Sequence, residues 1–172
     1  MFNPYLVGFM GAGKSAVGRA LADLMGYGFL DLDAVLVERF GMPIREVFAR
    51  RGEDRFREEE RAALVESTGL ERTVVATGGG AFCAEENRDI IHAAGGVSVF
   101  LDLPWRVLEE RLGADDGERP LASSLKEARR LYESRRPCYL LAARRVSLDG
   151  GETPGEAARR VRDALVGAAC AT

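Results

Sequence analysis

Histidine and cysteine are scarce in this sequence of 172 residues. It has one histidine, His92, and three cysteines, Cys83, Cys138 and Cys170, with no CxxC spacing among them. One histidine is too few for a zinc site built from His ligands or for a repeated histidine relay. An odd number of widely separated cysteines also argues against a disulfide framework. We therefore expect reduced thiols, as in a protein of the cytosol.

Long apolar runs and a large excess of one charge are also missing. No apolar run approaches the roughly 20 residues that cross a bilayer, and residues 1–4 lack the features of a secretory signal. The formal charge is 24 − 27 = −3, which does not indicate a nucleic-acid partner. No long exposed apolar stripe is evident. We expect a cytoplasmic monomer that binds neither membranes nor nucleic acid.

Lysine is nearly absent, because 2 of the 24 basic residues are Lys and 24 − 2 = 22 are Arg. One of the two, Lys14, lies in GFMGAGKS at residues 8–15, which matches the phosphate-binding pattern GxxxxGK[ST]. A β-rich run precedes this motif and a helical pattern follows it, as the motif requires. Glycines bring backbone N–H groups to phosphate oxygens, Lys14 supplies charge to the β/γ phosphates, and Ser15 offers a hydroxyl to Mg²⁺. The motif predicts ATP·Mg²⁺ contacts at Gly11, Ala12, Gly13, Lys14, Ser15 and Ala16.

Apolar β-rich runs alternate with helical patterns along the chain, which predicts an α/β fold with a parallel sheet. The predicted strands are residues 5–8, 28–31, 73–77, 97–101 and 145–148. The predicted helices are residues 14–25, 34–40, 44–50, 54–67, 85–94, 104–112, 121–137 and 154–166. There is no internal repeat or linker-like stretch, so residues 1–172 are predicted to form one domain, with a mobile lid at about residues 112–122.

Two carboxylates close the second predicted strand, in FLDLD at residues 29–33. Alternation along a strand would place Asp31 and Asp33 on one side, at the carboxyl end of the sheet, where ligands bind. One carboxylate would then face Mg²⁺ and its waters, and the other would accept a hydrogen bond from an attacking hydroxyl. Either Asp is also a suitable cap for the helix that follows. Asp102, after the fourth strand, is the alternative metal ligand or a cap before Pro104, and we favour Asp31.

Arginines and glycines supply further candidate residues. Arg57 lies in a helical segment dense in both charges, which by itself indicates a solvated face. The glycines at 78–80 end the third strand and favour contact between a ligand and backbone amides over a loose turn. Arg119 suits a closing loop that places charge on a phosphoryl group, or a surface position at a helix start. Arg135 and Arg136 would complement a helix dipole or clamp a carboxylate.

The phosphate-binding motif alone indicates a nucleotide and not a reaction. A guanine-reading Asn-Lys-x-Asp motif is absent, because the second lysine, Lys126, lies in Leu-Lys-Glu. A motor or transporter ATPase would normally be larger. The sequence therefore favours a small-molecule kinase.

In their order and spacing these motifs resemble those of the shikimate kinase family. They are the phosphate loop, GRxLA at 18–22, FxDxD at 29–33, GExxFRxxE at 52–60, GGG at 78–80, Arg111, RPL at 119–121 and RxPxY at 135–139. The resemblance spans about residues 6–166. It implies a three-layer α/β/α fold with a five-stranded parallel sheet, like that of the nucleoside monophosphate kinases. The implied reaction is transfer of the ATP γ-phosphoryl group to the 3-hydroxyl of shikimate, in aromatic amino-acid biosynthesis.

The resemblance also implies roles for individual residues, and it reverses the local interpretation of Arg57. Asp33 would hold the hydroxyl as the candidate base, and Arg119 would be the lid arginine. The implied catalytic residues are Lys14, Asp33 and Arg119. The implied shikimate-binding residues are Asp33, Arg57, Gly78, Gly79, Gly80 and Arg135. Further ATP contacts are implied at Arg111, Arg119 and Pro154, and Ser15 and Asp31 are the predicted Mg²⁺ ligands.

The sequence departs from the family pattern in two places. Ala16 stands where the family usually has a hydroxyl residue, which is expected to cost about 1 kcal/mol of ATP affinity. The segment Gly150-Gly151-Glu152 lacks the basic residue expected beside adenine. A gluconate-type sugar-acid kinase is the alternative enzyme, since its substrate also needs an arginine clamp. A non-catalytic ATP-binding module is the alternative from another class.

Overall fold

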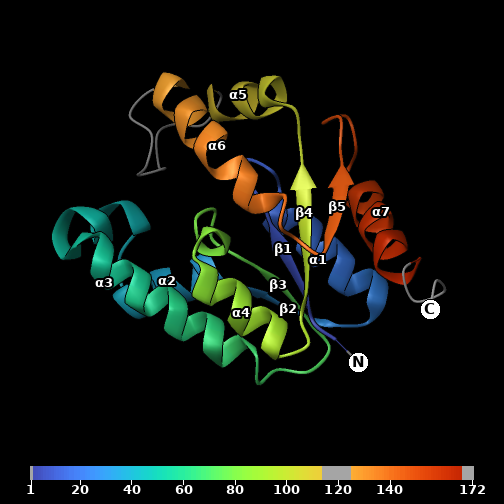
Figure 1. Ribbon diagram of the computed structural model, residues 1–172, viewed down its shortest axis with the longest axis horizontal. Helices are drawn as coiled ribbons and strands as arrows, with labels where there is room; N and C mark the ends of the chain where they lie inside the picture. Colours follow the sequence, from blue (N-terminus) through green and yellow to red (C-terminus); the bar gives the residue numbers. More distant parts are fainter. Residues whose placement is uncertain (1, 114–124, 168–172) are drawn as a thin grey trace.

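The computed structural model describes residues 2–113 and 125–167, and its five strands form one parallel sheet in the order β2-β3-β1-β4-β5 (Figure 1). The strands are β1 (Pro4–Val7), β2 (Gly28–Asp31), β3 (Thr73–Ala76), β4 (Val97–Asp102) and β5 (Arg144–Ser147). Each lies within one residue of its predicted bounds at both ends. The predicted α/β fold with a five-stranded parallel sheet is therefore confirmed.

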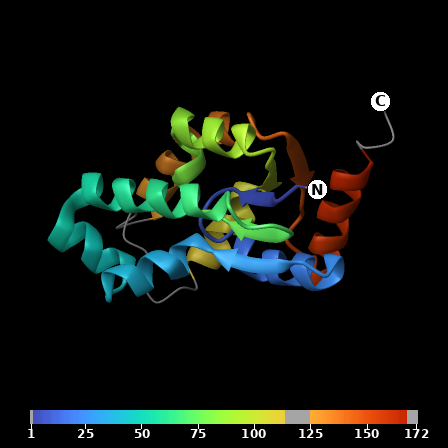
Figure 2. The ribbon, with the colours of Figure 1, turned by 90° about the horizontal axis from the view of Figure 1, so that it is seen from below.

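Helices cover both faces of this sheet. They are α1 (Lys14–Met25), α2 (Leu32–Phe40), α3 (Ile44–Ser67), the 3₁₀ turn η1 (Ala81–Cys83), α4 (Glu85–Ala93), α5 (Trp105–Gly113), α6 (Leu125–Tyr139) and α7 (Pro154–Val166). Helices α1 and α7 pack together on one face, and α3 and α4 lie on the other (Figure 2). Helices α5 and α6 pack together beyond the carboxyl end of the sheet (Figure 1). Within the described residues, no helix is both long and apolar enough to span a membrane.

Three helices differ from the sequence predictions by more than one residue. Helix α2 begins at Leu32 and not at residue 34, because the chain turns directly after Asp31. Residues 44–67 form one continuous element in which only Gly52, at φ 81°, departs from helical geometry, so the predicted break is a kink. The described part of α6 continues through Pro137 to Tyr139, and the predicted helical residues 121–124 lie outside the described residues.

The register of the central strands brings three loops to one level. Leu6 of β1 and Asp31 of β2 both pair with Ala76 of β3. Because β1 and β3 are buried along their whole length, this pairing is enclosed by helices on both faces. The segments that follow β1, β2 and β3 therefore leave the sheet side by side, at the edge where α/β proteins bind ligands.

Close packing of α1 against the sheet depends on a glycine. A Cβ atom added to Gly18 would lie 2.5 Å from Cε2 of Phe29 in β2, well inside van der Waals contact. Gly18 is buried in the middle of α1, where a glycine costs about 1 kcal/mol of helix stability relative to alanine. The close approach of helix and strand offsets that cost.

The substitution Gly18→Ala should lower the free energy of unfolding by about 1–3 kcal/mol, because overpacking outweighs the gain in helix propensity. Urea unfolding monitored by circular dichroism measures this change. Gly155→Ala in α7 is the matched control, since its nearest neighbour would be 3.9 Å away, and it should be neutral or stabilising. Equal effects of the two substitutions would contradict the packing argument.

Candidate active site

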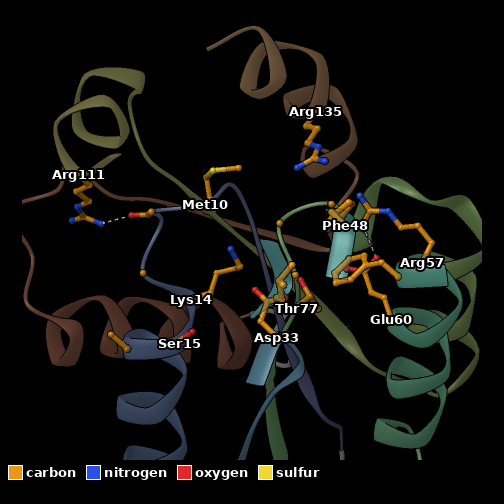
Figure 3. Close-up of a pocket in the computed structure, with 18 residues that line it drawn as sticks. Met10, Lys14, Ser15, Asp33, Phe48, Arg57, Glu60, Thr77, Arg111 and Arg135 are labelled. Carbon is orange, nitrogen blue, oxygen red and sulfur yellow. Dashed lines mark hydrogen bonds and ion pairs between the residues drawn. The ribbon is translucent and has the colours of Figure 1, made fainter. Parts of the chain in front are cut away.

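A cavity of about 540 Å³ lies at the carboxyl edge of the sheet (Figure 3). Its walls come from the β1–α1 loop, from α2 and α3, from the loop after β3, and from α5 and α6. The predicted site residues that line it are Gly11, Gly13, Lys14, Ser15, Ala16, Asp33, Arg57, Gly78, Gly79, Gly80, Arg111 and Arg135. It is also lined by Met10, Ile44, Phe48, Phe56, Glu60 and Thr77, which were not predicted as site residues.

The β1–α1 loop wraps around the ammonium group of Lys14. This buried group donates hydrogen bonds to the carbonyl oxygens of Gly8 (3.0 Å) and Phe9 (3.1 Å). Gly11 and Gly13 adopt left-handed φ values of 80° and 85°, which glycine reaches without strain. Gly13 also forms the N-cap of α1. The loop therefore presents a lysine and a helix N-terminus together, an arrangement that attracts phosphate.

The two predicted carboxylates take different positions. Oδ1 of Asp31 accepts a hydrogen bond from the backbone N–H of Asp33 (3.0 Å), so Asp31 is the N-cap of α2. Asp33 lies in the first turn of that helix, and its side chain lines the cavity beside Thr77. The strand-alternation argument was therefore wrong, because the strand ends at Asp31. Among the described residues, Asp31 is not part of the cavity lining.

Asp102, the alternative metal ligand, is engaged in ion pairs. It is buried, and its Oδ2 lies 2.6 Å from Nη2 of Arg145 and 3.2 Å from Nη2 of Arg136. The latter contact orients Arg136 toward β4, whereas Arg135 lines the cavity. Neighbouring residues on a helix point about 100° apart, so one arginine of the pair reaches the cavity and the other does not.

Arg57 is held in place by a buried carboxylate. Its Nη1 donates to Oε2 of Glu60 (2.7 Å), and its Nη2 lies 3.1 Å from Oε1 of Glu53. Glu60 is 1% exposed. Burial raises the pKa of Glu60, Arg57 opposes that rise, and nearby Asp33 adds to it. The local interpretation of Arg57 as part of a solvated face was wrong, because its side chain is 28% exposed and lines the cavity.

The three glycines after β3 make room for charged side chains. A Cβ on Gly80 would lie 3.0 Å from the guanidinium nitrogens of both Arg57 and Arg135, so the two cations converge above this residue. A Cβ on Gly78 would lie 2.6 Å from Oε1 of Glu60 and 2.9 Å from Oδ1 of Asp33. Two convergent guanidinium groups form a suitable site for a carboxylate.

Two phenylalanines line the cavity beside Arg57, and a buried tyrosine holds the glycine loop. Phe48 and Phe56 pack with ring centroids 4.6 Å apart. The hydroxyl of Tyr139 donates to the carbonyl of Gly79, which ties the glycine loop to α6. Burial raises the pKa of this tyrosine. Sequence reasoning missed the phenylalanines because apolar residues at helical spacing resemble core positions.

A second cavity of about 200 Å³ adjoins the β1–α1 loop. Arg111 borders it and donates to the carbonyls of Gly11 (2.9 Å) and Gly150 (3.4 Å). The residues lining this cavity are Ala12, Gly13, Ala16, Val17, Leu103, Arg111, Leu148, Glu152, Pro154 and Ala157. The predicted ATP contacts Arg111 and Pro154 thus line one cavity, together with apolar side chains suited to a planar base.

The predicted lid arginine, Arg119, lies outside the described residues, as do residues 114–122 of the predicted lid.

The described residues contain no cluster of ligands that would hold Mg²⁺ by itself, since no three His, Cys, Asp or Glu side chains gather as a metal site. Mg²⁺ needs no such cluster when nucleotide phosphates and waters supply most ligands, so the hydroxyl of Ser15 beside Lys14 is compatible with it.

Comparison with known proteins points to one family. The family model for shikimate kinase matches residues 10–166. The shikimate kinases of Nostoc punctiforme and Synechococcus sp. (strain RCC307) are 39% and 42% identical to the chain, over 95% and 96% of it and 90% and 85% of their own lengths. The structure of shikimate kinase from Acinetobacter baumannii in complex with shikimate matches with a TM-score of 0.91 at 33% identity, covering 99% of this chain and 96% of that one. A gluconokinase from Sinorhizobium meliloti matches with a TM-score of 0.60 at 25% identity, covering 98% and 93%.

Proposed function

The chain belongs to the shikimate kinase family and is an ATP-dependent kinase that acts on an alcohol group, and we propose that it phosphorylates the 3-hydroxyl of shikimate with the residues lining its main cavity. One observation carries this proposal. The phosphate loop, the carboxylate of Asp33 and the paired guanidinium groups of Arg57 and Arg135 all face the same cavity (Figure 3). A triphosphate, a hydroxyl and a carboxylate would each meet a complementary group there.

Arg57 and Arg135 would bind the carboxylate of shikimate. Their convergence above Gly80 supports this role, since a carboxylate accepts two guanidinium groups at once. Glu60 holds Arg57 through a short ion pair and so keeps its guanidinium from turning into solvent. Gly79 and Gly80, which have no side chains, would form the floor beneath the ring of the substrate.

Asp33 would orient the 3-hydroxyl and accept its proton as the new O–P bond forms and ADP leaves. Its position at the start of α2 supports this, because the same cavity contains Lys14 and Ser15. Lys14 would place its charge on the β/γ phosphates. The backbone N–H groups of the loop that runs from Gly11 to Gly13 would hold the remaining phosphate oxygens.

Mg²⁺ would be held by the hydroxyl of Ser15, by phosphate oxygens and by waters, with the carboxylate of Asp31 on the water side. When bound, it would neutralise negative charge on the phosphates and on the departing ADP, which gains the electron pair of the P–O bond that breaks. Asp31 keeps a second oxygen besides the one that caps α2, which is compatible with this role.

The remaining parts of the proposal rest on the sequence. They are a single domain spanning residues 1–172, a lid at about residues 112–122 that carries Arg119, and action as a monomer in the cytoplasm. Ala16 is exposed on α1, and its missing hydroxyl is expected to cost about 1 kcal/mol of ATP affinity.

Coupled measurement of ADP release tests the proposed substrate. Shikimate, gluconate and nucleoside monophosphates serve as acceptors at equal concentration, with a reaction lacking any acceptor as the control. We expect ADP release that depends on shikimate. Faster release with gluconate would favour the sugar-acid kinase alternative, and release that depends on no acceptor would remove the proposed reaction.

Substituting each carboxylate by its amide separates the two proposed roles. Asp33→Asn should lower kcat at least ~10²-fold, because the amide cannot accept the proton. Asp31→Asn keeps an oxygen that caps α2 and should instead raise the Mg²⁺ concentration for half-maximal activity by ~10-fold. Initial rates across a Mg²⁺ titration measure both. An unchanged kcat in the first variant, or an unchanged Mg²⁺ requirement in the second, would reduce that residue to a structural part of α2.

Alanine at each of two neighbouring glycines tests the arginine pair. Gly80→Ala should raise the KM for shikimate by at least ~10-fold, since its Cβ would push Arg57 and Arg135 apart. Gly79→Ala should have a smaller effect, because its nearest neighbour, the backbone nitrogen of Met10, would be 3.5 Å away. In both variants the KM for ATP should stay within about twofold. Equal changes in the two variants would count against a carboxylate site above Gly80.

A further inference from the structure

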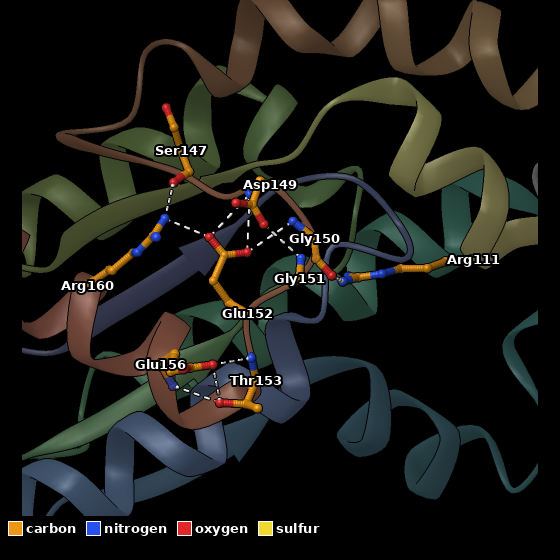
Figure 4. Close-up of polar contacts among 9 residues, drawn as sticks. All are labelled: Arg111, Ser147, Asp149, Gly150, Gly151, Glu152, Thr153, Glu156 and Arg160. Atoms are coloured by element: carbon orange, nitrogen blue, oxygen red, sulfur yellow. Dashed lines mark hydrogen bonds and ion pairs between the residues drawn. The ribbon is translucent and has the colours of Figure 1, made fainter.

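The segment between β5 and α7 folds around a carboxylate of its own (Figure 4). Oε2 of Glu152 accepts hydrogen bonds from the backbone N–H groups of Gly150 (3.0 Å) and Asp149 (3.1 Å), and Oε1 lies 3.2 Å from the latter nitrogen. The Glu152 side chain is 8% exposed. Backbone N–H groups of the loop therefore contact this carboxylate as they would contact a bound anion.

An arginine from the next helix compensates the charge of this carboxylate. Nη1 of Arg160, on α7, lies 2.6 Å from Oε1 of Glu152. The same nitrogen also donates to the carbonyl of Ser147 at the end of β5 (3.3 Å). Arg160 thus links Glu152 to α7 and, through Ser147, to the end of β5. An uncompensated acidic group near a triphosphate would repel the nucleotide. The ion pair with Arg160 offsets this repulsion.

The loop that Glu152 organises is joined to the phosphate loop through Arg111. The carbonyl of Gly150 accepts from Nη2 of Arg111 (3.4 Å), and Nη1 of the same side chain donates to the carbonyl of Gly11 (2.9 Å). Gly150 packs so tightly on α5 that an added Cβ would lie 2.4 Å from Cγ1 of Val107. The position of Gly150 therefore fixes one of the two partners that hold Arg111 beside the phosphate loop.

These contacts surround the smaller cavity. Glu152, Arg111 and Pro154 line it together, next to the apolar side chains of Leu103 and Leu148. Both oxygens of Glu152 already accept hydrogen bonds from the loop and from Arg160. The carboxylate therefore holds the loop that forms one wall of this cavity. The backbone and apolar groups of that wall would contact the nucleotide base.

We propose that Glu152, held by Arg160, is a positioning residue for ATP. It keeps the loop at residues 148–153 folded and keeps Arg111 placed between that loop and the phosphate loop. This rests on the proposed function, in which ATP is the phosphoryl donor. The acidic residue stands where a basic adenine contact was expected from the sequence, and it acts through the loop and not by touching the nucleotide.

Replacing either member of the ion pair tests this role. Glu152→Gln keeps the shape of the side chain but turns one acceptor into a donor that faces an N–H or guanidinium group. Arg160→Gln removes the compensating charge at a half-exposed position that is expected to tolerate change. We expect the Kd for ADP, measured by titration calorimetry, and the KM for ATP to rise by ~10-fold in each variant. The KM for shikimate and kcat should stay within about twofold.

Glu156→Gln is the matched control. Glu156 accepts from the backbone and side chain of Thr153 in the capping box of α7, two residues from Pro154. Glutamine also serves at this position of a capping box, so this substitution should leave the Kd for ADP within about twofold of wild type. The double variant of Glu152 and Arg160 should bind ADP no more weakly than the weaker single variant, because both act through one ion pair.

Two results would overturn the proposal. One is a Kd for ADP within about twofold of wild type in both single variants. The other is a rise in the KM for shikimate as large as the rise in the KM for ATP, which would indicate general loosening of the fold. ADP binding is measured without any acceptor, so its outcome is independent of whether shikimate is the substrate.

Discussion

The backbone ladder that joins β1 and β2 to β3 determines where the phosphate loop, Asp33 and the glycines of the main cavity lie. Leu6 and Asp31 both pair with Ala76, so the phosphate loop, the start of α2 and the glycines at 78–80 leave the sheet at one level. A slip of one residue would turn each strand's side chains to the opposite face. Because β1 and β3 are buried on both faces, such a slip would force the close-packed side chains on each face to repack, which is costly.

Ion pairs compensate several of the charged side chains in and around the two cavities. Glu60 is buried at a cost that Arg57 offsets, and this pair leaves the remaining donors of the guanidinium facing Gly80. Asp102 holds Arg136 outside the cavity and so leaves Arg135 as the cation that α6 contributes. At the smaller cavity, Glu152 of the loop before α7 and Arg160 of α7 balance each other. Among the described residues that line the main cavity, Lys14, Arg57, Arg111 and Arg135 are the cations placed to meet an anionic nucleotide and an anionic acid.

The central strands β1, β3 and β4 could be predicted closely because parallel strands buried on both faces appear as short apolar runs. The phosphate loop was equally recognisable, since few other structures need glycines, a lysine and a hydroxyl at that spacing. Prediction failed where the chain turned sooner than its pattern indicated. Asp31 and Asp33 look like two residues of one strand, yet Asp31 caps a helix that already contains Asp33. In so short a segment, a helix cap and a strand that continues are both compatible with two aspartates spaced two residues apart.

The sequence by itself determined the fold class, the phosphate loop and, through the order of its motifs, the family. It did so because these depend on backbone geometry and on residues close together in the chain. The resemblance implied Arg135 as a substrate ligand, and the tertiary structure supplied the reason, since Asp102 holds Arg136 outside the cavity. Only the tertiary structure decided that Arg57 rests on Glu60 above Gly80 and that Glu152 anchors its own loop. Each of these depends on where a long charged side chain finds its partner. That partner comes from another element, such as Asp102 for Arg136, or from the next turn of the same helix, and the local pattern does not specify it.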